Sequence, residues 1–376
     1  MRPEQLHEET LDRLGSVRGK LLVSIFFPTH EKGPEITQDP IRLKNHLAEV
    51  DDQLESSGLK VRERSQRLAE AHSLLDDLEF WEHQGTSLAV FIEDDGGTMP
   101  VSLPIPVEAN TWVGPHFHLR PLLGALDAGA LPVLVLTKGT VRLYESGRFE
   151  ISVVDADLPA SFDDVNWFIQ REPQRQQHPD RAGGSTRNRH GHDPKAKETE
   201  DLHRYLRAVS SALPGTIEGR HIVLLGDERA VSAFEEITEQ KVMIPPNFGV
   251  ARTDDVDEIH ARAMPVIDQV HRSAQESALE RAGSALGKGK ATTDLASALE
   301  AAAAGAVSEL VLRADAEPIP GVFDPDSMKV AKEDRPGAGV EDLIDRLVIH
   351  ARATGAAVTV IDAPDADHDF VAILRY

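Results

Sequence analysis

The first third of the chain combines one long apolar run with stretches in which leucine and valine recur every three or four residues. The run KLLVSIFFPTH, residues 20–30, predicts a buried strand that is closed by Pro28. Asp39-Pro40 then makes a favourable helix start, because proline fits the first helical turn. The apolar positions that follow at helical spacing are Leu43, Leu47, Val50 and Leu54.

A second helical pattern and two strand-like runs complete this part of the chain. The helix is predicted through Leu68, Leu75, Leu78 and Trp81, and the strands at residues 87–93 and 99–107. Helices among several strands predict a mixed α/β domain over residues 1–128.

A different pattern follows residue 129. Three short β-rich runs, separated by Lys138-Gly139 and Ser146-Gly147, predict a meander of hairpins. Residues 157–197 then lack periodicity over a length that is typical of a functional or disordered segment. The chain next reads as helix, strand RHIVLLG, a helix capped by Asp227 and strand KVMIP. These elements predict a second domain over residues 129–262.

The last part begins in a long helical pattern, about residues 254–286, which Pro265 is expected to kink or break. The order helix, glycine, strand then occurs twice, at residues 292–313 and 339–362. The run HDFVAILRY supplies a closing strand. This order predicts a compact α/β sandwich over residues 263–376.

Composition narrows the possible functions. The 376 residues contain no cysteine, which excludes disulfides, a thiolate nucleophile and cysteine-ligated zinc. We find no apolar run of membrane-spanning length and no signal peptide in MRPEQLHEETLDRLG, so we expect a cytoplasmic protein without a membrane partner. A net charge of −23 argues against general binding of nucleic acid.

One segment is basic although the chain as a whole is acidic. Residues 171–197 carry seven Arg or Lys against three Asp or Glu, around the paired glycines of DRAGGSTRNRHGHDPKAK. Such a local patch can bind phosphate, while the alternative is a solvated loop that is basic by chance.

Other constellations give weaker signals. His190, His192 and Asp193 can offer two metal ligands, but no further ligand is fixed, so we assign no metal and no cofactor. The run GSALGKGKATT, residues 283–293, lacks the spacing of a phosphate-binding loop and reads as a turn between helices. His116 and His118 form either a catalytic pair or a packing contact at the domain edge, and we favour packing.

The order of elements from residue 132 onwards resembles the middle domain of archaeal and eukaryotic class-1 peptide-chain release factors, which has an RNase H-like fold. The C-terminal part resembles the third domain of those proteins and of Pelota, with the fold of ribosomal kink-turn-binding proteins. The sequences SIFFPTH, QDPIRLKNHL and FHLRPLL resemble the bacterial archaeo-eukaryotic release factor family, third type.

This resemblance implies a role for the basic segment. In the release factors a Gly-Gly-Gln loop promotes hydrolysis of the ester between peptide and transfer RNA. Gly183 and Gly184 match the two glycines, whereas Ser185 occupies the glutamine position. Sequences corresponding to the stop-codon-reading motifs Asn-Ile-Lys-Ser and Tyr-Cys are also absent. The residues expected to contact RNA phosphates are Arg181, Arg187, Arg189, Lys195 and Lys197.

Three functions follow from these observations. The first is a ribosome-binding factor at the A site that contacts ribosomal or transfer RNA and acts in ribosome rescue or protection of idle ribosomes, with a translational GTPase as a further partner. The second is a peptidyl-tRNA hydrolase that uses the degenerate Gly-Gly loop. The third is a nuclease that uses Asp155, Asp157, Asp163 and Asp164. We expect the first, with binding but without hydrolysis.

Overall fold

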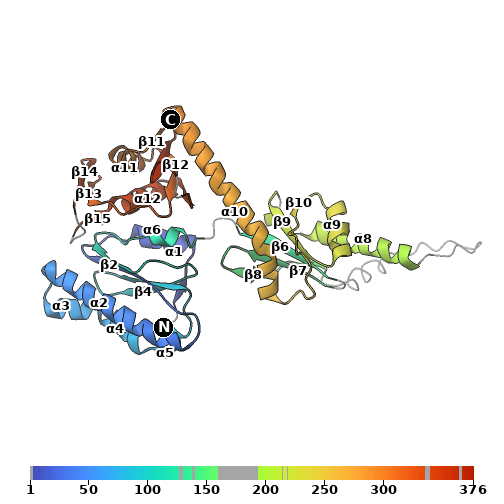
Figure 1. Cartoon of the computed structure of the whole chain (residues 1–376), viewed down its shortest axis with the longest axis horizontal. Helices are drawn as coiled ribbons and strands as arrows, with labels where there is room; N and C mark the ends of the chain where they lie inside the picture. The colour runs from blue at the N-terminus through green and yellow to red at the C-terminus, as the bar shows by residue number, and fades with distance from the viewer. Residues whose placement is uncertain are drawn as a thin grey trace, which may run out of the picture. The chain divides into compact units, whose positions relative to one another are not determined.

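The computed structural model describes residues 3–126, 130–137, 140–159, 194–213, 215–217, 219–334, 339–363 and 366–376. The chain forms two compact units, one of residues 1–126 with 273–376 and the other of residues 127–272. Both units contain sheets covered by helices, which confirms the mixed α/β class (Figure 1). The three-domain division with boundaries after residues 128 and 262 stays a prediction.

The N-terminal half of the first unit is built on a five-stranded sheet with the order β1-β4-β3-β2-β5. The apolar run predicted as a strand forms the interior strand between β3 and β5, and six of the seven residues in Leu22–Pro28 are buried. The strands are β1 (Glu4–Gln5), β2 (Leu22–Pro28), β3 (Ser87–Ile92), β4 (Thr98–Leu103) and β5 (Asn110–Gly114).

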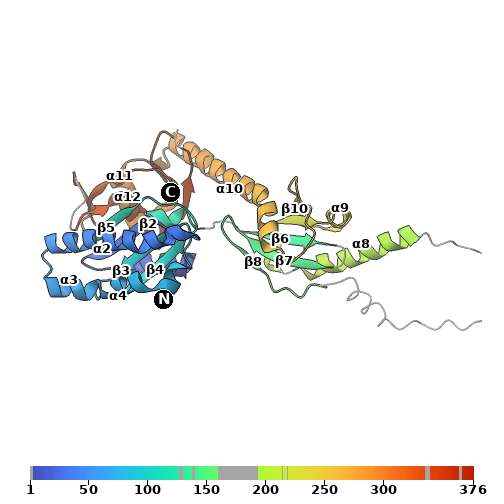
Figure 2. The same ribbon diagram turned by 60° about the horizontal axis from the view of Figure 1, so that its bottom comes forward.

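Helices cover both faces of this sheet, as Figures 1 and 2 show. One face packs against α2 (Asp39–Ser56), whose buried leucines and valine are those predicted from the helical spacing. The opposite face packs against α1 (Glu8–Ser16) and the turn that leads to α6 (Arg120–Leu123). Burial on both faces explains why β2 and β3 are mostly apolar on both sides rather than alternating.

The second predicted helix differs from the structure. Its range is divided among short helices, and Leu78 is 77% exposed although it was expected in the apolar stripe. Asp77 interrupts the run because its side chain caps a new helix at the N–H of Phe80. The segments are α3 (Val61–Arg67), α4 (Ala69–Ser73), the 3₁₀ turn η2 (Leu74–Asp76) and α5 (Leu78–Trp81). Another 3₁₀ turn, η1 (Pro34–Gln38), lies directly before α2.

The C-terminal half of the first unit contains two sheets and two helices. The larger sheet has the order β11-β17-β12-β16 and the smaller one β14-β13-β15. The repeated helix, glycine, strand order is confirmed by α11 (Leu295–Ala303) with β12 and by α12 (Leu343–Ala353) with β16. The strands are β11 (Ala291–Thr292), β12 (Val307–Arg313), β13 (Pro320–Asp324), β14 (Lys329–Lys332), β15 (Glu341–Asp342), β16 (Ala357–Ile361) and β17 (Phe370–Leu374).

A single hydrophobic core joins the two halves of this unit. Leu11, Phe26 and Phe117 from the N-terminal half and Leu310 and Leu347 from the C-terminal half belong to one cluster of buried side chains. The unit therefore depends on contacts between segments that are far apart in the sequence.

The second unit is a mixed sheet with the order β10-β9-β6-β7-β8. Its antiparallel part, β6-β7-β8, is the predicted meander. Strand β9 pairs in parallel with β6, and β10 pairs in parallel with β9. The strands are β6 (Leu131–Leu136), β7 (Val141–Ser146), β8 (Ile151–Val153), β9 (His221–Gly226) and β10 (Lys241–Met243).

Helices also cover both faces of this sheet. On one face lie α8 (Pro194–Ala212) and α9 (Glu228–Ile237), with Asp227 capping α9 as predicted. The first part of α10 (Val256–Gly287) covers the other face. A short 3₁₀ turn, η3 (Gly215–Ile217), precedes β9.

Pro265 does not end α10. The helix continues through it to Gly287 because Ile259, Ala263, Val266 and Ile267 on both sides of the proline are buried against the sheet. The loss of one backbone hydrogen bond is thus opposed by side-chain burial. Residues 283–287 of the run GSALGKGKATT belong to the end of α10, so the predicted turn is confined to residues 288–290, which lead through β11 to α11.

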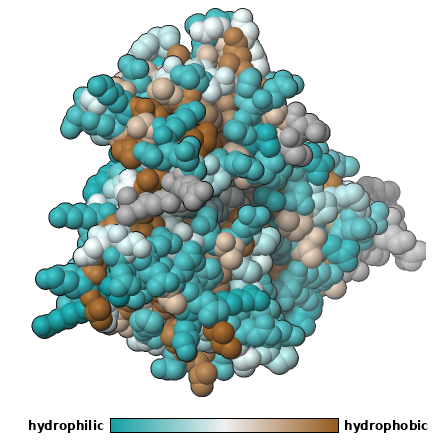
Figure 3. Space-filling model, turned by 60° about the vertical axis from the view of Figure 1, so that its left-hand side comes forward, coloured by the Kyte–Doolittle hydropathy of each residue, from teal (hydrophilic) through white to brown (hydrophobic). Residues whose placement is uncertain are grey.

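The surface agrees with the acidic composition. The face shown in Figure 3 is mostly hydrophilic, and hydrophobic residues form small separate patches on it. Among the helices that the structure describes, none combines the length and the apolar character needed to cross a membrane.

Candidate functional site

The residues expected to bind RNA lie almost entirely outside the described residues. This applies to Arg181, Gly183, Gly184, Ser185, Arg187 and Arg189. Lys195 and Lys197 fall in the first turns of α8, where the backbone alone is described. The structure therefore describes the scaffold on both sides of this segment.

The scaffold attaches the residue before the segment to the helix that follows it. Pro159 is the last described residue before it, and Pro194 opens α8 after it. The hydroxyl of Tyr205 on α8 donates a hydrogen bond of 2.9 Å to the carbonyl oxygen of Pro159. Since Tyr205 and its neighbour Leu206 are buried in the core beneath α8, this hydrogen bond is fixed to the rigid part of the unit.

The exposed face of α8 continues the polar character of the segment. Arg204 lies 3.6 Å from Glu200 and 3.8 Å from Asp201, so its charge is compensated. Arg207 is exposed and has no ion pair with a described residue. The sequence analysis did not single out Arg207; its position one turn beyond His203 on the exposed face of a helix with a clear apolar stripe is the signal that could have done so.

The carboxylates of the nuclease hypothesis do not form a described cluster. Asp155 and Asp157 are exposed, and Asp163 and Asp164 lie outside the described residues. Within the described parts of the chain, no group of three or more His, Asp or Glu side chains is arranged to hold a metal ion. His190, His192 and Asp193 also lie outside those parts.

The structure places His116 and His118 in the turn after β5, where they contact the C-terminal half of the first unit. His116 Nδ1 lies 3.0 Å from Glu341 Oε2. The ring of His118 stacks on Trp112 at 5.3 Å and is 3% exposed. Burial, with the positive charge of Arg120 as a second cause, lowers the pKa of His118 to about 3. A neutral, enclosed imidazole favours the packing interpretation over the catalytic one.

The same turn holds α12 through buried carboxylates. Asp345 Oδ1 accepts hydrogen bonds from the backbone N–H groups of Leu119 at 2.7 Å and Arg120 at 2.6 Å. Arg120 Nε also lies 3.4 Å from Asp342 Oδ2. Burial and the neighbouring charge of Asp342 raise the pKa of Asp345 to about 8. The sequence analysis missed these carboxylates, although charges inside the apolar run EDLIDRLVIHARA are an unusual feature.

A comparison with known protein families matches one stretch of the chain to a family. Residues 132–306 match the model of bacterial archaeo-eukaryotic release factor family 3. The resemblance to this family is confirmed. The matched stretch contains the release-factor-like sheet, α8, α9, α10 and the whole basic segment.

Solved structures add distant similarities. An archaeal translation termination factor, aRF1, is 15% identical, with 99% of each chain covered and a TM-score of 0.23. Pelota from Archaeoglobus fulgidus is 10% identical, with 100% of this chain and 94% of that chain covered and a TM-score of 0.34. Dom34 from S. cerevisiae is 11% identical, with 78% and 73% covered and a TM-score of 0.35. Similarities of this size do not establish a shared function, and the search of curated proteins found no match.

Proposed function

We propose that this protein is a release-factor-like factor that binds the ribosomal A site and acts in ribosome rescue or in protection of idle ribosomes, without reading stop codons. The observation that carries the proposal is the family match over residues 132–306, because the basic Gly-Gly segment lies inside it. The proposed site of action is the cytoplasm, where ribosomes are found.

The charge distribution supports the same proposal. Seven basic residues are concentrated in residues 171–197 of a chain with a net charge of −23. The basic segment can neutralise RNA phosphates, while the acidic remainder opposes binding to other polyanions. This combination suits a protein that docks on RNA at one place.

The scaffold suits a segment that must be presented to a binding site. Tyr205 ties α8 to Pro159, so both sides of the segment are anchored to one buried core. The proposed partners are ribosomal or transfer RNA, contacted through Arg181, Arg187, Arg189, Lys195 and Lys197. A translational GTPase is a further proposed partner, which a direct binding measurement with the purified proteins would test.

Co-sedimentation with purified ribosomes tests the proposal. We expect the protein to migrate with ribosomes at ~50–100 mM salt and to dissociate as salt increases. Replacing Arg187 and Arg189 with alanine removes about two phosphate contacts, so the slope of log affinity against log salt should become shallower by about 1–2.

A matched control uses exposed arginines outside the segment. Arg252 and Arg272 lie in the same unit, and their replacement by alanine changes the net charge by the same amount. The control should leave the slope unchanged. A wild-type protein that stays at the top of the gradient, or an equal slope for both double variants, would refute the proposal.

A further inference from the structure

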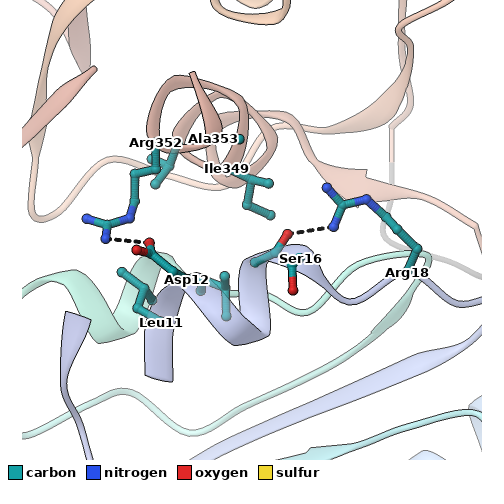
Figure 4. A pocket seen from close by; sticks show the side chains of 10 residues that line it. Leu11, Asp12, Ser16, Arg18, Ile349, Arg352 and Ala353 are labelled. Atoms are coloured by element: carbon teal, nitrogen blue, oxygen red, sulfur yellow. Dashed lines mark hydrogen bonds and ion pairs between the residues drawn. The ribbon is translucent and has the colours of Figure 1, made fainter. Parts of the chain in front are cut away.

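Two pockets of the first unit differ in the partners of their charged side chains. The pocket between α1 and α12, shown in Figure 4, is lined by two arginines. Arg352 Nη2 donates to Asp12 Oδ1 at 2.7 Å. Arg18 Nη1 donates to the backbone carbonyl oxygens of Gly15 at 2.5 Å and Val17 at 2.8 Å. Both arginines are therefore engaged within the chain.

The second pocket has a volume of about 580 Å³ and lies between the C-terminal part of α10 and the strands β12 and β17. Lys288 and Lys290 line it, are exposed, and have no ion pair with a described residue. Arg281 lines it as well, but its guanidinium donates to both carboxylate oxygens of Glu309, at 2.9 and 2.7 Å. The remaining acidic side chain of the lining is Glu280. The lining therefore has an excess of positive charge, which the two lysines carry.

The backbone that carries the two lysines is held in place at the end of α10. The N–H of Lys290 donates to the carbonyl oxygen of Ala285 at 2.9 Å, and the N–H of Gly289 donates to that of Leu286 at 3.0 Å. Gly289 has a φ of 66°, the left-handed conformation that is common just after a helix. The carbonyl oxygen of Lys290 accepts the N–H of Leu374 at 2.9 Å, which attaches this turn to β17.

These hydrogen bonds also determine which groups of the turn are available to a ligand. A lysine side chain near a helix C-terminus can bind the last carbonyl groups, but those of Ala285 and Leu286 already accept backbone N–H groups. The same hydrogen bonds use the N–H groups of residues 288–290, so the backbone of the turn does not bind an anion. The two ammonium groups are left for a ligand of the pocket.

The rest of the lining suits a nucleotide. Ser277 and Ser284 lie two helical turns apart on α10 and bring hydroxyl groups to the same pocket as the lysines. Lysine and serine side chains both bind phosphate oxygens in complexes with nucleic acid. The apolar lining residues Ala285, Ile373 and Leu374 offer a surface to a ribose or a base. The pocket volume lies within the range of small-molecule sites.

We propose that this pocket binds a nucleotide, with a phosphate group at Lys288 and Lys290 and the ribose or base against the apolar lining. The nucleotide is either free or part of an RNA chain, because both sources present the phosphate that the lysines bind. The RNA source rests on the proposed function, whereas the free nucleotide does not. The site is separate from the basic segment, since its residues belong to the first unit.

Calorimetric titration of the full chain with ADP tests the free nucleotide. We expect ADP to bind, and Lys288→Ala combined with Lys290→Ala to weaken its binding by about 10- to 100-fold, because charge-assisted hydrogen bonds are lost. The control combines Lys329→Ala with Lys332→Ala. These are exposed lysines of β14 in the same unit that do not line the pocket, so the affinity for ADP should not change.

Co-sedimentation with ribosomes tests the RNA source. Replacing both pocket lysines should make the slope of log affinity against log salt shallower by about 1–2, in addition to the change expected from Arg187 and Arg189. The control at Lys329 and Lys332 should keep the wild-type slope. Both double variants should unfold at the urea concentration of the wild type, because all four lysine side chains are exposed.

The outcomes separate this site from the proposed function. A loss confined to the variant of Lys288 and Lys290 supports the site, and the measurement that detects the loss identifies the source. The site is refuted if the two double variants have equal salt slopes and either equal affinities for ADP or no ADP binding at ~10 mM. If the wild type does not bind ribosomes, the proposed function fails and the ADP titration alone decides the site.

Discussion

Ser185 is the residue on which catalysis depends in the proposed family role. Hydrolysis in the release factors is associated with glutamine at this position, and the surrounding STRNRHGHD also departs from their loop. We predict that the wild-type protein binds ribosomes without releasing a labelled peptide above the factor-free background. Serine supplies the same backbone N–H as glutamine at this position, and loss of one oxyanion donor costs ~10²–10³ in rate. If that N–H alone supported the oxyanion, the donor would be intact in the wild type, which would then already release peptide.

The Ser185→Gln variant distinguishes these cases. Release by the variant but not by the wild type would identify the side chain as the missing group. Release by the wild type at a rate close to that of the variant would instead support the peptidyl-tRNA hydrolase hypothesis.

Among the glycines of the second unit whose surroundings the structure describes, Gly226 tolerates a side chain least. Its φ of 129° lies in the region that favours glycine, and a Cβ there would lie 1.8 Å from the carbonyl oxygen of Leu136. The close approach is fixed by the N–H of Asp227, which donates to that same oxygen at 2.7 Å. We predict that Gly226→Ala lowers the free energy of unfolding by at least about 2 kcal/mol.

Urea denaturation of the variant measures this effect. Gly249→Ala is the control, because Gly249 is exposed and a Cβ there would meet no atom within 4 Å. Similar midpoints for the two variants would show that the end of β9 can relax around a side chain.

At the scale of elements, the attachment of α12 to the turn at residues 116–120 makes stability depend on pH. The folded state holds a proton on Asp345, since burial and Asp342 raise its pKa to about 8. This contribution is complete below the ordinary pKa of an aspartate and is lost as pH rises to about 8. The buried His118, with a pKa of about 3, contributes in the opposite sense, and its contribution is lost as pH falls below about 6.5.

Between pH ~6.5 and 8 the contribution of Asp345 is therefore expected to dominate. We predict that the free energy of unfolding falls across this interval, with a limiting slope of about 1.4 kcal/mol per pH unit. Asp345→Asn should flatten the profile, because an amide oxygen can still accept from Leu119 and Arg120 but cannot titrate. Urea denaturation at several pH values measures both slopes, and equal slopes would assign the effect to another group.

Elements with one continuous apolar stripe were predictable from sequence, and elements interrupted by local capping were not. The stripe of α2 fixes its range and its buried face. In residues 61–81 the leucines at helical spacing are divided among several short helices. The Asp77 cap that begins the last of these helices is a local hydrogen bond with no periodic signature. Pro265 was expected to kink or break the helix, and the break does not occur, since tertiary burial around the proline outweighs its helix-breaking tendency.

At the scale of the whole molecule, the sequence pattern indicated which segments are α/β but not which share a core. Phe26 and Leu310 lie in runs that were predicted as strands, yet nothing local shows that they pack into the same cluster. The buried carboxylates of α12 escaped prediction for the same reason, because their partners lie in the turn at residues 116–120. The basic segment was visible at once, since charge excess and glycine content need no tertiary information.

The shared core of the first unit has a consequence for biosynthesis. The N-terminal half leaves the ribosome first, but α1 and the turn at residues 116–120 pack against α12, which is translated near the end. The intervening residues 127–272 form their own unit and can fold during the delay. Nascent chains of this protein should therefore expose the apolar side chains of α1 and of this turn that join the shared core through most of elongation, and depend on chaperones until the C-terminal half emerges.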